Sequence, residues 1–243
     1  MKISVCIPMY NESAIIADNA KRLWEYMESN FVNELGEREY EIIYSNDGST
    51  DSCADIVRDL NLPGIIVTGY DKNQGKGCAV RTAMLMAKGD VCMFTDADLA
   101  YGTDVIGQMV DAFEDNPDSM LVIGSRNLSN DGYSNYTFVR KIASKMYIKV
   151  LCLVGGFKLS DSQCGCKGFR QEAVREIFPR LQVNGFAFDF EALLWASKLN
   201  YKISEMPVIV KVHGDSKVRI LRDTFRMLRD IIKMKRRINK TEI

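Results

Sequence analysis

The chain has 243 residues, 47% of them hydrophobic and 26% charged, with 32 basic and 32 acidic side chains. This composition is typical of a globular protein with a substantial core, and it excludes an intrinsically disordered chain. No apolar stretch approaches the roughly 20 residues that a membrane span needs, and the first residues lack a signal-peptide pattern, so we expect no bilayer-crossing segment.

Short apolar runs alternate with helical patterns through the first half of the chain. Strands are expected over 2–7, 40–45, 65–68, 91–95 and 120–123, and helices over 13–27, 54–60, 78–87 and 104–113. Ser13 is the expected N-cap of the first helix. This order predicts parallel βαβ units with right-handed crossovers, and therefore an α/β, Rossmann-like domain with a mostly parallel central sheet and helices on both faces.

The second half begins with a surface loop over 127–135. Helices are expected over 139–153, 171–178 and 188–199, and strands over 163–169 and 204–212. No linker separates two domains, so residues 1–216 are expected to form one domain. The seven cysteines lack the paired spacing of a zinc site, and we expect reduced thiols in a cytosolic compartment.

Residues 217–243 form a basic appendage on an acidic body. From Lys217 onward ten Lys and Arg residues stand against three acidic ones, a net charge of +7, which leaves −7 on residues 1–216. On a helix, one face would be apolar and another cationic; the apolar set is Leu221, Phe225, Leu228, Ile231 and Ile232, and the cationic set is Arg222, Arg226, Arg229, Lys233 and Arg237. Such a helix can lie on an anionic membrane or pack on its own domain.

Two carboxylates, Asp96 and Asp98, follow the buried run 91–94. Side chains two residues apart on an extended chain point the same way, so this pair can bind one Mg²⁺ or Mn²⁺ ion, which in turn can hold nucleotide phosphates. A plain turn is the alternative, because Asp is common in turns. Polar loops at 8–13, 46–51 and 95–100 all follow strands and should converge at one sheet edge, which favours the metal site.

A set of loop motifs resembles those of family 2 glycosyltransferases, which are inverting enzymes with a GT-A fold. The motifs are Pro8-Met9-Tyr10-Asn11-Glu12, Asn46-Asp47-Gly48-Ser49-Thr50-Asp51, Gly75-Lys76-Gly77, Asp96-Ala97-Asp98-Leu99 and Gly124-Ser125-Arg126. Later runs at 161–169, 186–191 and 214–217 are similar to those of polyprenyl-phosphate sugar transferases. Within these, the chain looks closest to the dolichyl-phosphate β-glucosyltransferases, with the dolichyl-phosphate mannose synthases as near neighbours.

The resemblance implies transfer of a hexose, with glucose from UDP-glucose favoured, to a polyprenyl or dolichyl phosphate. The alternatives are a GDP-mannose-dependent mannosyltransferase, a family 2 transferase acting on a sugar hydroxyl, and a nucleotide-sugar-binding module without catalysis. A membrane surface is the implied partner, at the cytoplasmic inner face of a membrane, together with a homo-oligomer or a membrane-embedded protein as a further partner. Nucleic acid is not expected, because the body is acidic and no DNA or RNA motif is present.

The resemblance also assigns roles to residues. The nucleotide sugar would be bound by Pro8, Tyr10, Glu12, Asp47, Lys76 and Asp96; the metal by Asp96 and Asp98; and the acceptor phosphate by Arg126, Arg140, Ser144, Gln163 and Lys217. Asp98, Arg126 and Asp189 would be catalytic. Asp189 occupies the general-base position of enzymes with hydroxyl acceptors. For a phosphate acceptor, its role would be orientation or electrostatics rather than proton removal.

Simpler roles remain open for several of these residues. Asp47 can belong to an ordinary turn, Asp189 can be a helix N-cap, and an Arg can face solvent or pair with a carboxylate. Two departures from the family pattern also matter: Ala100 replaces a Gln that helps bind the metal in mannose synthases, and His213 stands where an aromatic residue is common. His213 can serve as a replacement metal ligand or as a structural histidine.

Overall fold

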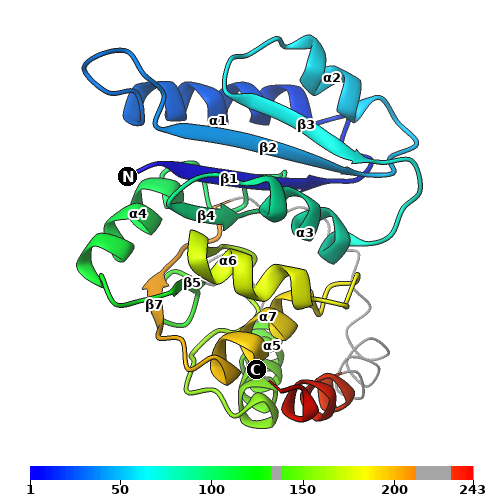
Figure 1. The fold of residues 1–243 in the computed structure, drawn as a ribbon, viewed down its shortest axis with the longest axis vertical. Helices are drawn as coiled ribbons and strands as arrows, with labels where there is room; N and C mark the ends of the chain where they lie inside the picture. The colour runs from blue at the N-terminus through cyan, green and yellow to red at the C-terminus, as the bar shows by residue number, and fades with distance from the viewer. Residues whose placement is uncertain (133–137, 212–230, 243) are drawn as a thin grey trace.

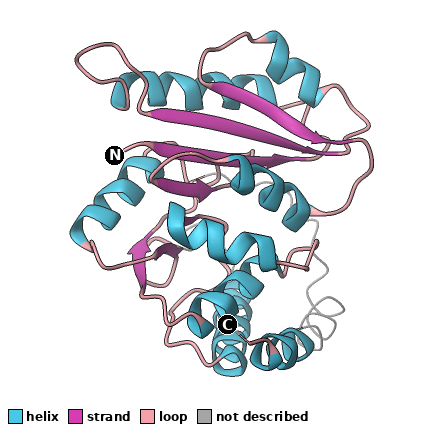
Figure 2. Cartoon of the chain, in the orientation of Figure 1, coloured by secondary structure: helices cyan, strands magenta, loops and turns pink. Residues whose placement is uncertain are grey.

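The protein is described by a computed structural model over residues 1–132, 138–211 and 231–242 (Figures 1 and 2). The strands are β1 (Ile3–Met9), β2 (Tyr40–Asp47), β3 (Ile65–Tyr70), β4 (Val91–Phe94), β5 (Leu121–Ser125), β6 (Lys167–Arg170) and β7 (Ile203–Pro207). The helices are α1 (Ile16–Asn30), α2 (Cys53–Asp59), α3 (Lys76–Met86), α4 (Val105–Asp115), α5 (Phe138–Gly155), α6 (Gln171–Ile177) and α7 (Phe188–Lys198). Residues 231–240 are also helical and are called the C-terminal helix below.

A seven-stranded sheet in the order β3-β2-β1-β4-β6-β5-β7 forms the centre of the molecule. The pairs β1–β2, β1–β4, β2–β3 and β5–β7 are parallel, which confirms the predicted mostly parallel sheet. Strand β6 is antiparallel to both of its neighbours. Its first residue, Lys167, pairs with Phe94, the last residue of β4, and with Ile123, the central residue of β5.

The direction of β6 was not predicted, because the expectation of a mostly parallel sheet assigned no direction to the strand expected over 163–169. After β5 the chain passes through α5 and returns over 156–166 to the edge at which β5 ended. Starting there, β6 can only run in the opposite direction. The consequence is functional, since the 156–166 loop is added to the carboxyl edge of the sheet.

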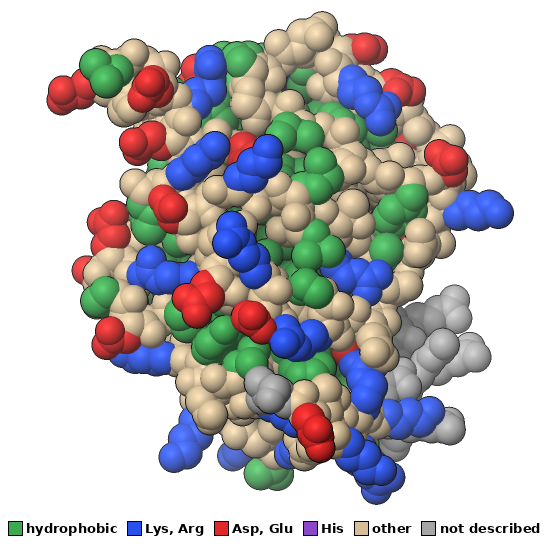
Figure 3. Space-filling view, viewed as in Figure 1, with side chains coloured by type: hydrophobic (Ala, Val, Ile, Leu, Met, Phe, Trp, Pro, Cys, Tyr) green, Lys and Arg blue, Asp and Glu red, His purple; other side chains and the backbone are tan. Residues whose placement is uncertain are grey.

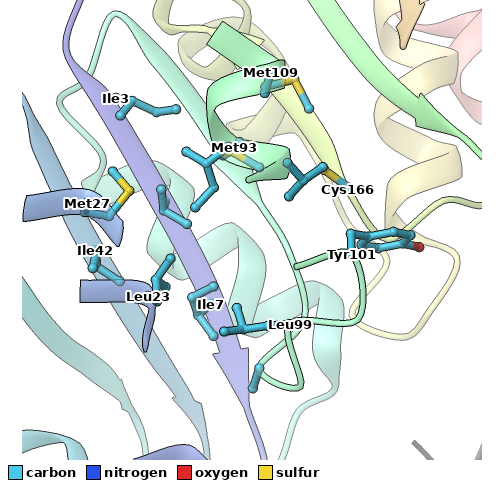
Figure 4. Close-up of a cluster of buried hydrophobic side chains, with 14 of the residues drawn as sticks. Ile3, Ile7, Leu23, Met27, Ile42, Met93, Leu99, Tyr101, Met109 and Cys166 are labelled. Carbon is cyan, nitrogen blue, oxygen red and sulfur yellow. The ribbon is translucent and has the colours of Figure 1, made fainter. Parts of the chain in front are cut away.

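Helices cover both faces of the sheet, as predicted. Along β1, Ile3, Val5 and Ile7 pack into a core shared with α1, α2 and α4, whereas Cys6 faces a second core shared with α3, α6 and α7. Figure 4 shows part of the first core. Strand β1 is buried on both faces, which is the pattern that its continuous apolar run predicted.

Several element boundaries differ from the expectations. Strand β6 begins at 167 rather than 163. Strand β7 ends at Pro207 rather than 212, because its neighbour β5 ends at Ser125, the residue that pairs with Pro207. Helix α1 begins at Ile16, and Ser13 is not its cap: the Ser13 backbone N–H instead donates to Asp51 Oδ2 at 2.8 Å.

The described part of the C-terminal helix packs on its own domain. Ile231, Met234 and Ile238 are buried in the second core, and Lys235 Nζ donates to the carbonyl oxygen of Val154 at 2.7 Å. Arg237, expected on a cationic face, is ion-paired with the buried Glu191. The boundary expected at 216 and the segment 217–230 lie outside the described residues. Among the described helices, none combines the length and hydropathy needed to cross a membrane.

Candidate active site

The turn after β4 presents Asp96 and Asp98 at the carboxyl edge of the sheet. Ala97 and Leu99 are buried in the first core, where Figure 4 labels Leu99, whereas Asp96 and Asp98 are partly exposed. The backbone N–H of Leu99 donates to the Asp96 carbonyl oxygen at 3.0 Å, and Leu99 has a φ of 49°. The segment is therefore a tight turn that also directs two carboxylates away from the core, and the two interpretations of the motif are compatible.

The electrostatics of this pair favour a cation. Burial, followed by repulsion from Asp96, raises the pKa of Asp98, although the N–H of Ala100 and the charge of Lys76 oppose the rise. A divalent ion between the two carboxylates would remove this repulsion, and carboxylate oxygens are preferred ligands of Mg²⁺ and Mn²⁺. The residues present thus fit such an ion. Within the described residues, no group of three or more His, Cys, Asp and Glu side chains is placed to hold a metal.

Lys76, in the first turn of α3, is ion-paired with Asp96. Burial alone would lower the pKa of Lys76, but the carboxylates of Asp96, Asp189 and Asp98 raise it. The lysine therefore stays charged beside the two carboxylates. This places a predicted nucleotide-sugar ligand and a predicted metal ligand in direct contact.

Asp47, at the end of β2, organises the loop over 70–75. Its carboxylate accepts hydrogen bonds from Tyr70 Oη at 2.7 Å, Asn73 Nδ2 at 2.9 Å, and the backbone N–H groups of Gln74 and Gly75 at 2.8 and 3.0 Å. Asp47 therefore shapes the segment that leads into Lys76. A contact between Asp47 and a nucleotide base stays a prediction.

The loops after β1 and β2 are joined by hydrogen bonds. The Asn11 backbone N–H donates to Ser49 Oγ at 3.1 Å, and the Thr50 N–H donates to Asn11 Oδ1 at 2.8 Å. Pro8 is half-buried at the end of β1 and Tyr10 is 39% exposed, while the Glu12 carbonyl caps the start of α1. The structure thus brings the predicted nucleotide-side loops together, and their contacts with a ligand stay predictions.

Arg126, just after β5, is held by the fully buried Asp161. Its Nε and Nη2 atoms lie 2.7 and 3.0 Å from the two Asp161 oxygens. Asp161 is in turn placed by Glu205 on β7, which accepts hydrogen bonds from the backbone N–H groups of Ser160 and Asp161. The bidentate pair fixes the orientation of the guanidinium. Arg126 thus pairs with a carboxylate, which was one of the simpler roles left open for it, and it still lies at the carboxyl edge of the sheet.

Asp189 lies in the first turn of α7 and is not its N-cap, which is Ala187. Its Oδ2 atom accepts a hydrogen bond from Lys167 Nζ at 2.8 Å, and its Oδ1 atom accepts one from the N–H of Phe190 at 2.7 Å. Lys167 is fully buried and also donates to the carbonyl oxygen of Cys164 at 2.6 Å. Both oxygens of the predicted catalytic carboxylate therefore have partners.

Other predicted residues are placed less completely. Gln163 lies in the 156–166 loop, where its N–H donates to Asp161 Oδ1 at 3.1 Å. Arg140 and Ser144 lie on α5, and their side chains are outside the described part of the structure. His213 and Lys217 also lie outside it.

The structure adds site residues that sequence reasoning did not single out, namely Tyr101, Asp161, Gly165 and Lys167. The Gly165 N–H donates to Tyr101 Oη at 3.1 Å, and a Cβ atom on Gly165 would lie 2.8 Å from Asp96 Oδ2. Asp161, Gly165 and Lys167 all lie in the 161–169 motif. The available signal for Lys167 was a lysine inside the strand expected over 163–169, where a buried charge needs a partner.

The family model described as glycosyl transferase family 2 matches residues 4–178. The chain belongs to this family. The prediction of a family 2 glycosyltransferase with a GT-A fold is thereby confirmed.

Curated proteins are similar to most of the chain. Dolichyl-phosphate beta-glucosyltransferase ALG5C of Trichomonas vaginalis is 33% identical over 220 residues, which cover 88% of this chain and 65% of that protein. Dolichyl-phosphate beta-glucosyltransferase of Dictyostelium discoideum is 31% identical over 252 residues, covering 96% and 73%. The chain thus spans about two thirds to three quarters of the length of these relatives.

Solved structures share the fold at lower identity. Glucosyl-3-phosphoglycerate synthase of Mycobacterium tuberculosis, in complex with Mn²⁺, UDP and phosphoglyceric acid, superposes with a TM-score of 0.70 at 18% identity. The similarity covers 100% of this chain and 80% of that one. It supports the family 2 fold.

Proposed function

We propose that this chain transfers glucose from UDP-glucose to a polyprenyl or dolichyl phosphate, with inversion at the anomeric carbon. The observation that supports this most is the meeting of two charge systems at one sheet edge. Asp96, Asp98 and Lys76 provide a cation-binding, nucleotide-facing side, and Arg126 provides a fixed cation on the other side. The names of the two curated relatives supply the sugar and the lipid acceptor.

On the donor side, Asp96 and Asp98 would hold a Mg²⁺ or Mn²⁺ ion, which would supply positive charge for the departing nucleoside diphosphate. Lys76 keeps Asp96 in place and adds a positive charge beside the leaving group. The 46–51 and 70–75 loops, joined through Asp47, form the pocket for the base and ribose.

On the acceptor side, Arg126 orients the lipid phosphate, together with Arg140, Ser144, Gln163 and Lys217. A phosphate oxygen forms the bond to the anomeric carbon as the bond from that carbon to the nucleotide oxygen breaks. The electron pair of the broken bond leaves with UDP. Because the phosphate is already ionised at neutral pH, the step needs no proton abstraction.

The environment of Asp189 favours this acceptor over a sugar hydroxyl. A general base must be within reach of the acceptor hydroxyl, whereas Asp189 is 7% exposed and its oxygens accept hydrogen bonds from Lys167 Nζ and the Phe190 N–H. Asp189 would therefore position Lys167 and the 164–167 backbone around the acceptor. A hydroxyl-directed transferase predicts instead that Asp189→Asn abolishes turnover.

The lipid acceptor implies that the protein associates with a membrane surface. Helix α5 has an exposed apolar face that can make this contact. Met146, Val150 and Leu153 are 65%, 43% and 80% exposed on this helix, with Lys145 and Lys149 exposed beside them. Lys and Arg side chains also gather at the end of the molecule formed by α5 and the C-terminal helix (Figure 3). An apolar helix face flanked by lysines is suited to the interface of an anionic leaflet, here the cytoplasmic one.

The test is a transfer assay with the purified protein, Mn²⁺ or Mg²⁺, dolichyl phosphate in detergent, and either labelled UDP-glucose or labelled GDP-mannose. We expect a β-linked glucosyl phosphate lipid from UDP-glucose and little product from GDP-mannose. Product from GDP-mannose alone would show that the enzyme is a mannosyltransferase and would contradict the proposed use of UDP-glucose. No sugar lipid from either donor, although nucleotide binds, would support a binding module.

A further inference from the structure

The C-terminal helix is connected to the donor side of the site through a buried carboxylate. Glu191, on α7, is fully buried and ion-paired with Arg237 of that helix. Arg237 also donates to Gln182 Oε1 through its other terminal nitrogen. Arg237 thus contacts both α7 and the loop over 181–185 that precedes it.

Glu191 holds the same loop from the other side. Its carboxylate accepts hydrogen bonds from the backbone N–H groups of Gln182, at 3.0 Å, and Val183, at 2.8 Å. Removing Arg237 would leave the carboxylate buried with these backbone donors alone, which is unfavourable for a charged group. Arg237, Glu191 and the 181–185 loop therefore form one packed unit.

The 181–185 loop also packs against the first turn of α3. The carbonyl oxygen of Asn184 accepts hydrogen bonds from the N–H groups of Gly77, at 2.7 Å, and Cys78, at 3.3 Å. The two chains approach so closely that a Cβ atom on Gly75 would lie 2.5 Å from the Asn184 oxygen, and one on Gly77 would lie 2.6 Å from the Val183 oxygen. Arg81 adds a hydrogen bond to the Leu181 carbonyl oxygen at 2.6 Å.

The turn that receives these contacts carries Lys76, which is ion-paired with Asp96. Figure 1 shows the C-terminal helix in red at one end of the molecule and α3 close to the sheet. We propose that Arg237 is a positioning residue for the donor site: through Glu191 it holds the 181–185 loop against the first turn of α3 and so fixes Lys76 beside the diphosphate. This proposal rests on the function proposed above.

The test compares Arg237→Ala with Arg236→Ala, which removes the same charge from an exposed position on the same helix. Hydrogen–deuterium exchange of the full chain without ligand should speed up at residues 182–183 and 77–78 in Arg237→Ala only. UDP affinity in the presence of Mn²⁺ should weaken about 3- to 30-fold in that variant, as expected for coupling through a packed network. Arg237→Lys, which keeps a charge beside Glu191, should recover part of the affinity.

The kinetic signature should be selective. The KM for the nucleotide sugar should rise in Arg237→Ala while the KM for the lipid phosphate stays near that of Arg236→Ala. If Arg237→Ala does not fold, Gln182→Ala removes one Arg237 contact at an exposed position and should give a smaller shift of the same kind.

Equal exchange and equal UDP affinity in the Arg237 and Arg236 variants would overturn the inference while leaving the proposed function intact. A wild-type protein that binds no nucleotide at all would overturn both. A uniform loss of affinity for donor and acceptor would also contradict a role at the donor side.

Discussion

Asp51 shows how single carboxylates fasten the loops around the site. Its Oδ2 and Oδ1 atoms accept hydrogen bonds from the backbone N–H groups of Ser13, at 2.8 Å, and Cys53, at 3.1 Å. Burial alone would raise the pKa of Asp51, but these donors lower it to about 2. The ionised carboxylate therefore joins the loop after β1 to the start of α2 more strongly than the protonated carboxyl group does.

This predicts a pH dependence of stability. A carboxylate with a lowered folded-state pKa stabilises the fold above its unfolded value of about 3.9, and this stabilisation is lost as the pH falls toward about 2. Asp51→Asn should cost on the order of 1 kcal/mol at pH 7 and flatten the change in stability over that window. Urea unfolding at a series of pH values measures it.

Asp55→Asn is the matched control, because Asp55 lies on the exposed surface of α2 and is 73% exposed. It should leave the acid limb of the stability curve almost unchanged. An Asp51→Asn curve parallel to that of the wild type between pH 7 and pH 2 would contradict the account.

At the scale of elements, the antiparallel entry of β6 brings the 156–166 loop against Asp96. A Cβ atom on Gly165 would lie 2.8 Å from Asp96 Oδ2, the end of a side chain that can move. Gly165 has an ordinary backbone conformation, so an alanine there would not strain the chain. The cost falls on the carboxylate rather than on the fold.

Gly165→Ala should therefore lower Mn²⁺-dependent UDP affinity by about tenfold, the equivalent of about 1.4 kcal/mol, while the melting temperature changes little. Calorimetric titration and thermal unfolding of the same sample separate the two effects. Gly107→Ala on α4 serves as the control, since an added Cβ there would approach only the Tyr26 hydroxyl of α1, at 2.7 Å. Wild-type UDP affinity in Gly165→Ala would show that the loop does not constrain Asp96.

At the scale of the whole molecule, the sequence predicted the sheet, its two covered faces and most element positions, because apolar periodicity is a local signal. It did not predict that β6 is antiparallel to its neighbours, since the direction of β6 depends on the sheet edge at which the chain re-enters after α5. It also did not predict the pairing of Arg126 with Asp161 or of Asp189 with Lys167. Those pairs join residues 35 and 22 positions apart through the fold.

The basic tail illustrates the same limit. An amphipathic pattern shows which face is apolar but not what covers it, and in the described part Ile231, Met234 and Ile238 are covered by the protein's own core. Among the described residues, α5 exposes an apolar face of Met146, Val150 and Leu153, in a stretch that the sequence marks as apolar but too short to span a membrane.

Substitutions on α5 test the membrane association. Met146→Ser combined with Leu153→Asp should weaken binding to anionic vesicles by about tenfold or more, because each apolar side chain that enters the interface contributes on the order of 1–2 kcal/mol. Transfer to a short-chain, water-soluble acceptor should be unaffected. Vesicle co-sedimentation and the soluble assay report the two quantities.

Leu35→Ser provides the comparison, because Leu35 is 84% exposed in the loop between α1 and β2. It should bind vesicles like the wild type. Equal binding by the α5 variant would place the membrane contact elsewhere on the molecule.

Sugar transfer to a lipid phosphate is proposed to depend on a metal ion held by Asp96 and Asp98, the carboxylates after β4. The most direct measurement is the rate of glucosyl transfer from UDP-glucose to dolichyl phosphate by wild type, Asp98→Asn and Asp111→Asn, over a Mn²⁺ titration. Asp111 is exposed on α4 and controls for loss of an acidic charge. We predict metal-dependent transfer by the wild type and Asp111→Asn, and a loss of about 100-fold or more in Asp98→Asn. Transfer by Asp98→Asn at the wild-type rate and Mn²⁺ dependence would contradict the account.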